Sequence, residues 1–362
     1  MNIGFDAKRA FLNQTGLGFY SRNLISAVQE LSSNQAVLFT PRVKISFPLS
    51  KSTKVITPPN MLPRFLGSIW RSFLIIFQKE IRQVDIYHGL SGELPFFLSH
   101  SVKKVVTIHD ILFERFPEDY PFLDRWFARL KTKYACRSAD AIIAVSQGTK
   151  QDLIDFYNVN PEKIVVVSVP VTISSKAEIM ELHSRPFIVM VSSFQSRKNQ
   201  ILLIKAFEAI ADLVDFDLIL VGKGAATLSL CKDYVKNSKV EPRVLFRETV
   251  SDNELPSYYN QAIFSVYASL YEGFGIPIVE SLGYGCPILA SDNMVHQEVG
   301  GTAAVYFKNG SLQDLKDKIL EMRSNIEEQR SKVLKNRNSI METYSPSHIG
   351  KQVMTIYDSL FS

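Results

Sequence analysis

The stretch Tyr271-Glu-Gly-Phe-Gly-Ile-Pro-Ile-Val-Glu280 holds two carboxylates eight positions apart, with two glycines, a proline and an apolar run between them. Each glycine and the proline weakens or stops a helix, so the middle of this stretch is not a helix interior. Proline suits the first turn of a helix, and we therefore expect a glycine loop that enters a helix near Pro277. Glu272 then lies on the loop, and Glu280 lies on the first or second turn of the helix.

This loop and helix start are suited to a ligand. The amides of Phe274, Gly275 and Ile276 would point toward whatever lies in front of the helix, and such an end attracts anions. A row of amides with a carboxylate on each side indicates a ligand that carries both phosphate and hydroxyl groups. A capped helix start with two solvated glutamates is the alternative, and the spacing alone does not separate the two.

The glutamate pair carries a family resemblance. Glu272-x7-Glu280, with Gly285-Cys-Pro287 behind it, resembles the signature of retaining glycosyltransferases of the GT-B fold. The most similar group is glycosyltransferase family 4 (glycosyl transferases group 1), the glycogen-synthase and mannosyltransferase type. Further segments match this family in the same order: Thr15-Gly-Leu-Gly-Phe-Tyr20, Thr107-Ile-His-Asp110, Ser196-Arg-Lys-Asn199, Val221-Gly-Lys-Gly224, and Ser291-Asp-Asn293 with Glu298. The resemblance covers nearly the whole chain and is weakest over residues 44–66.

Short apolar runs alternate with amphipathic stretches along the chain, and the pattern restarts after residue 170. This alternation predicts an α/β fold with parallel sheets covered on both faces. The resemblance implies the GT-B arrangement, two doubly wound Rossmann-like domains facing a cleft. The expected strands are 2–6, 36–40, 85–88, 104–108, 141–145 and 163–167, then 187–191, 217–221, 244–246, 264–266 and 287–290. The expected helices include 20–31, 64–83, 123–137, 199–213, 227–237, 253–260, 278–283 and 312–340.

The domain boundary is expected near residues 169–175, where a strand runs into Pro and Ser. The predicted domains are an acceptor-binding Rossmann-like domain over 1–170 and a nucleotide-sugar-binding Rossmann-like domain over 171–345. A last helix over 346–362 follows a Ser-Pro-Ser start that resembles an N-terminal cap. The resemblance implies that this helix packs back on the first domain.

Composition sets limits on the class of protein. The chain has 362 residues, 46% apolar and 21% charged, which describes a globular protein of two ordinary domains. No apolar run approaches the roughly 18 residues that span a bilayer, and no signal peptide is visible. The three cysteines form no zinc pattern and suit a reducing cytoplasm. We therefore expect a cytoplasmic protein without a metal or other cofactor, the nucleotide sugar being a substrate.

The net charge of +5 is uneven. Residues 1–170 carry a net +7 and residues 171–362 a net −2. The basic half is suited to an anionic surface or acceptor, and ordinary solvated charge is the alternative. Within it, residues 65–77 are apolar over a wide arc, with Arg64, Arg71 and Lys79 around them. A basic amphipathic helix of this kind can lie on the inner face of a membrane, whereas burial against the sheet is the plainer interpretation, and we favour it.

The resemblance assigns roles to particular residues. Arg197 and Lys198, which follow the strand at 187–191, clamp the donor diphosphate, although Ser192-Ser193 stands where the family often has Gly-Thr or Gly-Arg. His109 lies by the transferred sugar, Glu272 contacts sugar hydroxyls and an oxocarbenium-like transition state, and Glu280 binds the ribose. The catalytic set is therefore Glu272, His109, Lys198 and Arg197. The donor-binding set is Gly16, Gly18, Ser193, Gly222, Val250, Phe274, Gly275, Ile276 and Glu280.

Two other motifs indicate what the chain is not. Both glycine loops, at Gly16 and at Gly222, lack the third glycine of a dinucleotide fingerprint, which argues against NAD. Asp215-Phe-Asp217 is a D-x-D triplet of the kind that holds a metal in GT-A glycosyltransferases. Here it precedes a buried-looking strand, and we interpret it as a solvated strand entry with no metal.

The resulting hypothesis is a metal-independent retaining glycosyltransferase. It would move a hexose from GDP-mannose or a UDP-sugar to a sugar or lipid-linked saccharide acceptor in cell-surface polysaccharide synthesis. Its partners would be the donor and the acceptor, with no nucleic acid, and peripheral membrane association would occur through the basic domain. The alternatives are an NAD-dependent oxidoreductase or a nucleotide-sugar epimerase on the same scaffold, and a catalytically silent sugar-nucleotide-binding assembly protein.

Overall fold

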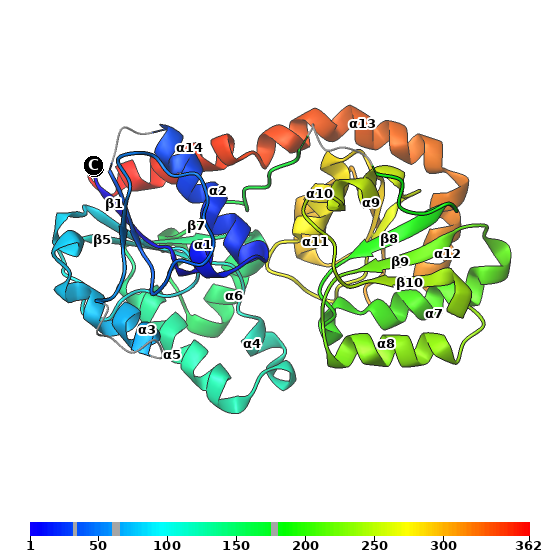
Figure 1. The fold of residues 1–362 in the computed structure, drawn as a ribbon, viewed down its shortest axis with the longest axis horizontal. Coiled ribbons are helices and arrows are strands. Elements are labelled where there is room, and N and C mark those ends of the chain that lie inside the picture. Colours follow the sequence, from blue (N-terminus) through cyan, green and yellow to red (C-terminus); the bar gives the residue numbers. More distant parts are fainter. Residues whose placement is uncertain (32–34, 60–65, 175–179) are drawn as a thin grey trace. The chain divides into compact units, whose positions relative to one another are not determined.

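The computed structural model describes residues 1–31, 35–59, 66–174 and 180–362. The chain divides into two compact units (Figure 1). The first comprises Met1–Thr172 and Tyr344–Ser362, and the second comprises Ile173–Thr343. These limits lie within two residues of the domain limits expected from the sequence.

The first unit is built on a seven-stranded parallel sheet with the order β3-β2-β1-β4-β5-β6-β7. The strand order changes direction between β1 and β4: β2 and β3 follow on one side of β1, and β4 to β7 follow on the other. Open α/β sheets bind ligands at such switch points. The strands are β1 (Ile3–Asp6), β2 (Ala36–Phe39), β3 (Lys54–Ile56), β4 (Ile86–Gly89), β5 (Lys103–Ile108), β6 (Ala141–Ala144) and β7 (Ile164–Val166). β3 was not expected from the sequence.

Helices cover both faces of this sheet. The main ones are α1 (Lys8–Leu12), α2 (Gly16–Leu31), α4 (Leu112–Arg115), α5 (Phe122–Ser138), α6 (Gln147–Tyr157) and α14 (Pro346–Ser359). α14 begins at a Ser345 cap, whose side chain accepts from the amide of His348. Gly350 lets α14 approach α2 closely, because a Cβ there would lie 2.8 Å from that of Ala27. The C-terminal helix is thus part of the first unit.

Residues 66–83 do not form the continuous helix predicted over 64–83; residues 64 and 65 lie outside the described part. The segment consists of α3 (Gly67–Ile69), a wide π-helical turn, and two 3₁₀ turns separated by an extended residue. The wide turn buries the consecutive residues Trp70, Arg71 and Ser72, which the three- and four-residue spacing of an α-helical face would not do. Arg71 is therefore a core residue, so the favoured interpretation of burial applies to Trp70 and Arg71, and the membrane-facing alternative is wrong for Arg71.

The second unit is built on a six-stranded parallel sheet with the order β10-β9-β8-β11-β12-β13. Its switch point lies between β8 and β11. The strands are β8 (Phe187–Val191), β9 (Asp217–Val221), β10 (Val244–Arg247), β11 (Ser265–Tyr267), β12 (Ile288–Ser291) and β13 (Val305–Phe307). The helices are α7 (Gln200–Ile210), α8 (Ala226–Lys236), α9 (Leu255–Gln261), α10 (Ile276–Gly283), α11 (Met294–Gly300), α12 (Leu312–Ser324) and α13 (Ile326–Thr343).

In both sheets the strands are parallel, apolar and buried, and they alternate along the chain with helices. The predicted α/β class with two Rossmann-like sheets is therefore confirmed. Each unit has its own core. In the second unit, for example, Phe207, Phe216 and Phe264 are fully buried against the sheet.

Candidate active site

The candidate site of the second unit lies at its switch point, beyond the carboxyl ends of β8 and β11. The chain leaving β8 forms a 3₁₀ turn at Ser196–Lys198, and the chain leaving β11 runs through Ser269 to Glu272. The amide of Leu270 donates to the carbonyl of Arg197 at 2.8 Å, which ties the two loops together. The glycine loop predicted before Pro277 is the continuation of the second of these loops.

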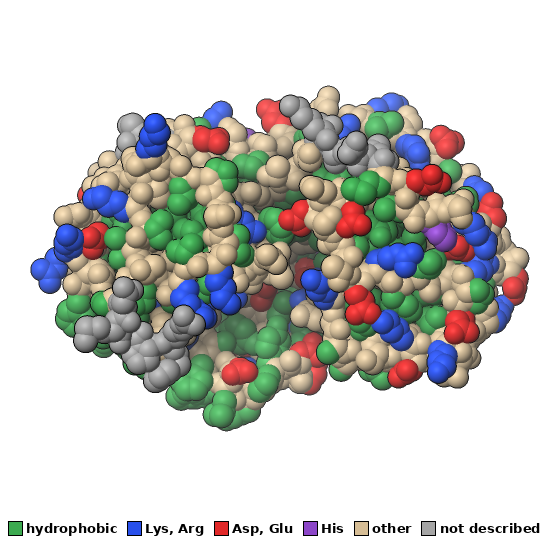
Figure 2. All heavy atoms as spheres, viewed as in Figure 1, with side chains coloured by type: hydrophobic (Ala, Val, Ile, Leu, Met, Phe, Trp, Pro, Cys, Tyr) green, Lys and Arg blue, Asp and Glu red, His purple; other side chains and the backbone are tan. Residues whose placement is uncertain are grey.

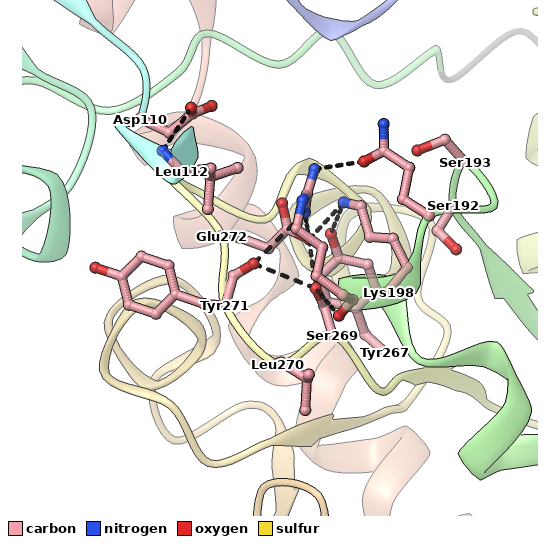
Figure 3. Close-up of polar contacts among 12 residues, drawn as sticks. Asp110, Leu112, Ser192, Ser193, Lys198, Tyr267, Ser269, Leu270, Tyr271 and Glu272 are labelled. Atoms are coloured by element: carbon pink, nitrogen blue, oxygen red, sulfur yellow. Dashed lines mark hydrogen bonds and ion pairs between the residues drawn. The ribbon is translucent and has the colours of Figure 1, made fainter. Parts of the chain in front are cut away.

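Glu272 binds both cations of the predicted pair (Figure 3). Its Oε1 lies 2.5 Å from Lys198 Nζ and 2.7 Å from Arg197 Nη1. Ser269 Oγ donates to the same oxygen at 2.5 Å. Burial alone would raise the pKa of Glu272, but Lys198 and Arg197 outweigh it and hold the pKa at about 2. The carboxylate is therefore ionised and serves as a fixed acceptor rather than as a proton donor.

Lys198 is held from two sides. Its Nζ donates to the hydroxyl of Tyr267 at 3.1 Å and lies 5.5 Å from the centre of the Tyr267 ring, a cation–π contact. Arg197 extends toward a different partner, because its Nη2 donates to Gln195 Oε1 at 2.7 Å. Lys198 is 8% exposed, so its ammonium group is largely shielded from solvent.

Ser192 and Ser193 are fastened to the start of α7. Gln200 Nε2 donates to Ser192 Oγ at 2.9 Å and to the carbonyl of Ser193 at 2.8 Å. Two hydroxyls thus occupy the place where the family often has a glycine, and the Ser192 hydroxyl has a protein partner.

α10 begins as the sequence predicts. Gly275 has a φ of +112°, a conformation that glycine adopts without strain, and it precedes the first helical residue, Ile276. No side chain caps this end, and the first amides of a helix have no acceptor within the helix. Phe274 is buried. Pro277 lies in the first turn and Glu280 in the second.

Glu280 has a neighbourhood unlike that of Glu272. Its Oε2 accepts from the Tyr259 hydroxyl at 3.0 Å, and Tyr259 stacks on Tyr284 with ring centroids 5.8 Å apart. Burial raises the pKa of Glu280 to about 7; the Tyr259 hydrogen bond acts in the opposite direction, and Asp252 adds to the increase. This carboxyl changes its charge near neutral pH and carries no salt bridge within the described residues.

His296 was not predicted from the sequence. It lies on α11, its ring centroid is 4.9 Å from that of Tyr267, and it is fully buried. Its Nδ1 lies 3.0 Å from Asn293 Nδ2 and 3.1 Å from the carbonyl of Ser291. Burial lowers the pKa of His296 to about 4, so it is neutral at pH 7. The nearest sequence signal was the Ser291-Asp-Asn293 motif, whose Asn293 caps the helix that carries this histidine.

The second glycine loop has a structural explanation. A Cβ at Gly222, where φ is +147°, would lie 1.9 Å from the carbonyl oxygen of Ser192. A Cβ at Gly224 would lie 2.5 Å from atoms of Phe194. These glycines allow the loops after β8 and β9 to pack on each other, and Val250 packs against the neighbouring apolar cluster. The donor contacts expected of Gly222 and Val250 stay a prediction.

Three of the predicted site residues, His109, Gly16 and Gly18, belong to the first unit. His109 follows β5; its Nε2 lies 2.9 Å from the carbonyl of Leu90, and its ring meets the edge of Tyr20. Burial lowers the pKa of His109 to about 4. Gly16 and Gly18 lie in the first turn of α2, not in a loop, and α1 precedes them. A Cβ at Gly18 would meet the Asn13 carbonyl, so that glycine allows two parts of the chain to approach closely.

The two carboxylates of the D-x-D triplet have different surroundings, because Asp215 is exposed and Asp217 is buried. Asp217 is buried and accepts from His183 at 2.8 Å, with Arg243 Nε at 3.4 Å. Asp215 pairs with Arg323 at the surface. The prediction of solvation at Asp217 is wrong, because that carboxylate is buried beside the guanidinium groups of Arg243 and Arg185. No group of three or more potential metal ligands occurs among the residues that the structure describes.

A further ionic cluster lies at the switch point of the first unit and was also missed. Arg71 Nη1 lies 2.5 Å from Asp6 Oδ2, at the end of β1, and Arg71 also pairs with Glu93. Lys131 of α5 lies 3.5 Å from Glu93. The first and last residues of this cluster, Asp6 and Lys131, are 125 positions apart in the sequence, so no local spacing indicates the cluster.

Two protein families match the chain. Residues 15–175 match the family described as Glycosyltransferase Family 4, and residues 174–338 match Glycosyl transferases group 1. The first match covers most of the first unit, and the second covers the unit that carries Glu272, Lys198 and Glu280.

Individual proteins agree with these families. The chain is 27% identical over 303 residues to the O-antigen chain mannosyltransferase RfbU of Salmonella typhimurium, which covers 81% of this chain and 82% of the relative. It is 26% identical over 249 residues to the O-antigen chain mannosyltransferase B of Escherichia coli, covering 65% of this chain and 64% of that protein. Among solved structures, Anabaena Alr3699/HepE in complex with UDP and glucose shares the fold at a TM-score of 0.76 and 17% identity, covering 99% and 100% of the two chains.

The two parallel Rossmann-like sheets and the likeness to that solved structure show the GT-B fold. Within that class, the chain belongs to glycosyltransferase family 4 and is an enzyme that transfers a glycosyl group. Among the described residues, no helix is long and apolar enough to cross a bilayer.

Proposed function

We propose that this glycosyltransferase moves a hexose, with retention of the anomeric configuration, from GDP-mannose or a UDP-sugar to a saccharide acceptor. Mannose is the sugar in the names of the two relatives described above, and both are named O-antigen chain mannosyltransferases. The acceptor we propose is a sugar or a lipid-linked saccharide of a cell-surface polysaccharide. The enzyme would meet such an acceptor at the cytoplasmic face of the membrane.

The observation that carries the proposal is the pair of cations at Glu272. Lys198 and Arg197 share one carboxylate oxygen, in front of loops at the switch point where open α/β sheets bind ligands. A diphosphate placed there accepts from Lys198, from Arg197 and from the amides at the start of α10. As the bond to the sugar breaks, the charge on the leaving diphosphate grows, and these fixed donors stabilise it.

The two glutamates then serve different parts of the donor. Glu280 lies one helical turn beyond Gly275 and binds the ribose hydroxyls, because an ionised carboxylate accepts two hydrogen bonds at once. The hydrogen bond from the Tyr259 hydroxyl holds the carboxylate in one orientation. Glu272, already ionised, accepts from hydroxyls of the transferred sugar and stabilises positive charge that develops on its ring.

This division of roles argues against a covalent glycosyl-enzyme. A double displacement requires a carboxylate close to the anomeric carbon and a second one as acid and base. Glu280 is committed to the ribose, and Glu272 is held by two cations and Ser269. We propose same-face attack, in which the acceptor oxygen bonds to the anomeric carbon, the bond to the diphosphate breaks, and the leaving phosphate takes the acceptor proton.

The positive charge at the diphosphate comes from side chains in this proposal, so no metal is required. A thermal-shift screen of nucleoside diphosphates and their sugars, each with and without EDTA, tests the donor site. We expect one base to raise the melting temperature, equally in both conditions. A shift that requires a divalent cation would contradict the metal-independent site, and the absence of any shift would contradict the donor assignment.

A further inference from the structure

Helix α5 presents large apolar side chains to the outside of the first unit. Its buried residues are Thr132, Ala135 and Cys136, which recur at three- and four-residue spacing and face the core. The apolar residues that recur on the opposite side are exposed: Phe122, Leu123, Trp126, Phe127 and Leu130. The first two are 68% and 65% exposed. The larger apolar side chains of this helix therefore point away from the core, unlike those of an ordinary surface helix.

Aromatic residues outside α5 extend this surface. Phe97 is 76% exposed and has a φ of +63°, a strained conformation for a bulky side chain. Its amide donates to the hydroxyl of Tyr134, on the last turns of α5, at 3.1 Å. Phe96 lies between Tyr134 and Phe73, with ring centroids 4.2 Å and 4.8 Å away. Figure 2 shows apolar side chains gathered over α4 and α5.

The same helix concentrates positive charge. Its 17 residues hold five basic side chains and one acidic one. The resulting +4 is more than half of the net +7 of residues 1–170. Arg129 is paired with Glu114 and Lys131 with Glu93, so the basic side chains without a salt bridge among the described residues are Arg125, Lys133 and Arg137. Aromatic and leucine side chains bordered by Lys and Arg are the composition of helices that lie in the headgroup region of a bilayer.

We propose that the outer face of α5, together with Phe97 and Phe73, docks on the surface of an anionic lipid bilayer. The apolar side chains enter the boundary between headgroups and acyl chains, and the basic side chains bind lipid phosphates. A second copy of this chain is a poorer occupant, because two such helices face to face would bring their basic side chains together.

This surface identifies the partner in the membrane association proposed above, and it replaces residues 65–77 as the main contact. Trp70 and Arg71 of that segment are buried, and only its outer side chains, such as Phe73 and Phe77, are exposed. The docking surface does not involve the donor site, so the two can be tested separately.

Vesicle flotation of the whole chain tests the docking surface. Vesicles of phosphatidylcholine alone are compared with vesicles that also contain phosphatidylglycerol. The apolar variant is Phe122→Ser with Trp126→Ser, and the charge variant is Arg125→Gln with Lys133→Gln. The control is Leu213→Ser with Leu230→Ser, which removes equally exposed apolar side chains from the second unit. A nucleoside diphosphate thermal shift on every variant reports separately on fold and donor site.

We expect the wild type and the control to float with anionic vesicles and much less with neutral ones. The apolar variant should lose at least about tenfold in partitioning, and the charge variant about fivefold for each charge removed. Wild-type flotation of both variants would overturn the proposal. It would also be overturned by a wild-type dimer that the apolar variant dissociates and that does not bind vesicles, since a second copy would then be the occupant.

Discussion

Lys198 Nζ and Glu272 Oε1 lie 2.5 Å apart, although 74 positions separate these residues in the sequence. The contact forms because parallel strands β8 and β11 are neighbours, so the loops after them leave the same edge of the sheet. Both side chains are almost fully buried. In the proposed reaction Lys198 neutralises a leaving diphosphate, and Glu272 fixes the ammonium group before the donor arrives.

Lys198→Ala should reduce kcat more than about 100-fold, the scale of losing one charge-stabilising donor in a transition state. Lys232→Ala is a matched control, because Lys232 pairs with Glu248 at the surface and exposed pairs contribute little. Steady-state release of nucleoside diphosphate measures both variants. Near-normal turnover of a folded Lys198→Ala protein would contradict the phosphate role.

Glu280 makes donor binding depend on pH. Its pKa of about 7 means that the carboxylate needed for the ribose forms as the pH rises through 7. The affinity for a nucleoside diphosphate should therefore increase between pH 6 and pH 8, a range set by that pKa, and Glu280→Gln should bind weakly with a flat profile. Calorimetric titrations across this range measure the effect.

Glu280→Ala should raise KM more than it lowers kcat, because the ribose contact contributes mainly to donor binding. A variant in which kcat falls more than KM rises would contradict the ribose assignment.

The same carboxyl affects the stability of the ligand-free protein with the opposite sign. The pKa of Glu280 is raised above the value of about 4.5 expected for the unfolded chain, so the folded state binds the proton more tightly. Its contribution to the free energy of unfolding is complete below that unfolded value and is lost as the pH rises toward 7. Glu280→Gln should thus melt at a temperature that increases relative to the wild type between pH 5 and pH 8. A constant difference would show that the pKa is not raised.

His109 should affect turnover without affecting nucleotide binding. Its pKa of about 4 keeps the ring neutral at pH 7, so it acts as a hydrogen-bonding group rather than as a titrating base. We expect His109→Ala to lower kcat and to leave the nucleoside diphosphate thermal shift unchanged. An equal loss of nucleotide binding would show that His109 acts elsewhere.

Arg71 should be a stability residue. It neutralises Asp6 and Glu93 inside the first unit, and removal of one partner leaves a buried charge unpaired, at a cost of about 3–5 kcal/mol. Urea unfolding of Arg71→Ala, with the 85% exposed Lys79 changed to Ala as control, measures this difference. Equal free energies of unfolding for Arg71→Ala and Lys79→Ala would contradict the burial of Arg71 and would indicate that it lies at the surface.

The sequence predicted what depends on local spacing. Most of the strands, though not β3 and β13, the loop before Pro277 and the position of Glu280 in the second turn of α10 follow from apolar runs and from proline and glycine preferences. The proximity of Arg197, Lys198 and Glu272 was not visible in any one segment and came from the family resemblance. Ser269, Tyr259 and His296 were missed because a buried partner found across the sheet leaves no periodic signal.

One error has a clear physical origin. Asp217 was predicted to be solvated because charged residues usually are, yet it is buried beside opposite charge from a distant segment. Gly18 and Gly222 were predicted to bind the donor; both allow the chain to approach itself closely, and their contact with a donor stays a prediction. A glycine shows that space is short without showing what occupies it.

The most direct test of the central claim is the release of nucleoside diphosphate from purified protein incubated with UDP- and GDP-sugars, with and without a saccharide acceptor. Only a transferase with the proposed donor site should release one diphosphate slowly in water, faster with acceptor, and more than about 100-fold more slowly after Lys198→Ala. Release that is unaffected by Lys198→Ala, or a wild type that binds the donor and never releases diphosphate, would contradict the account.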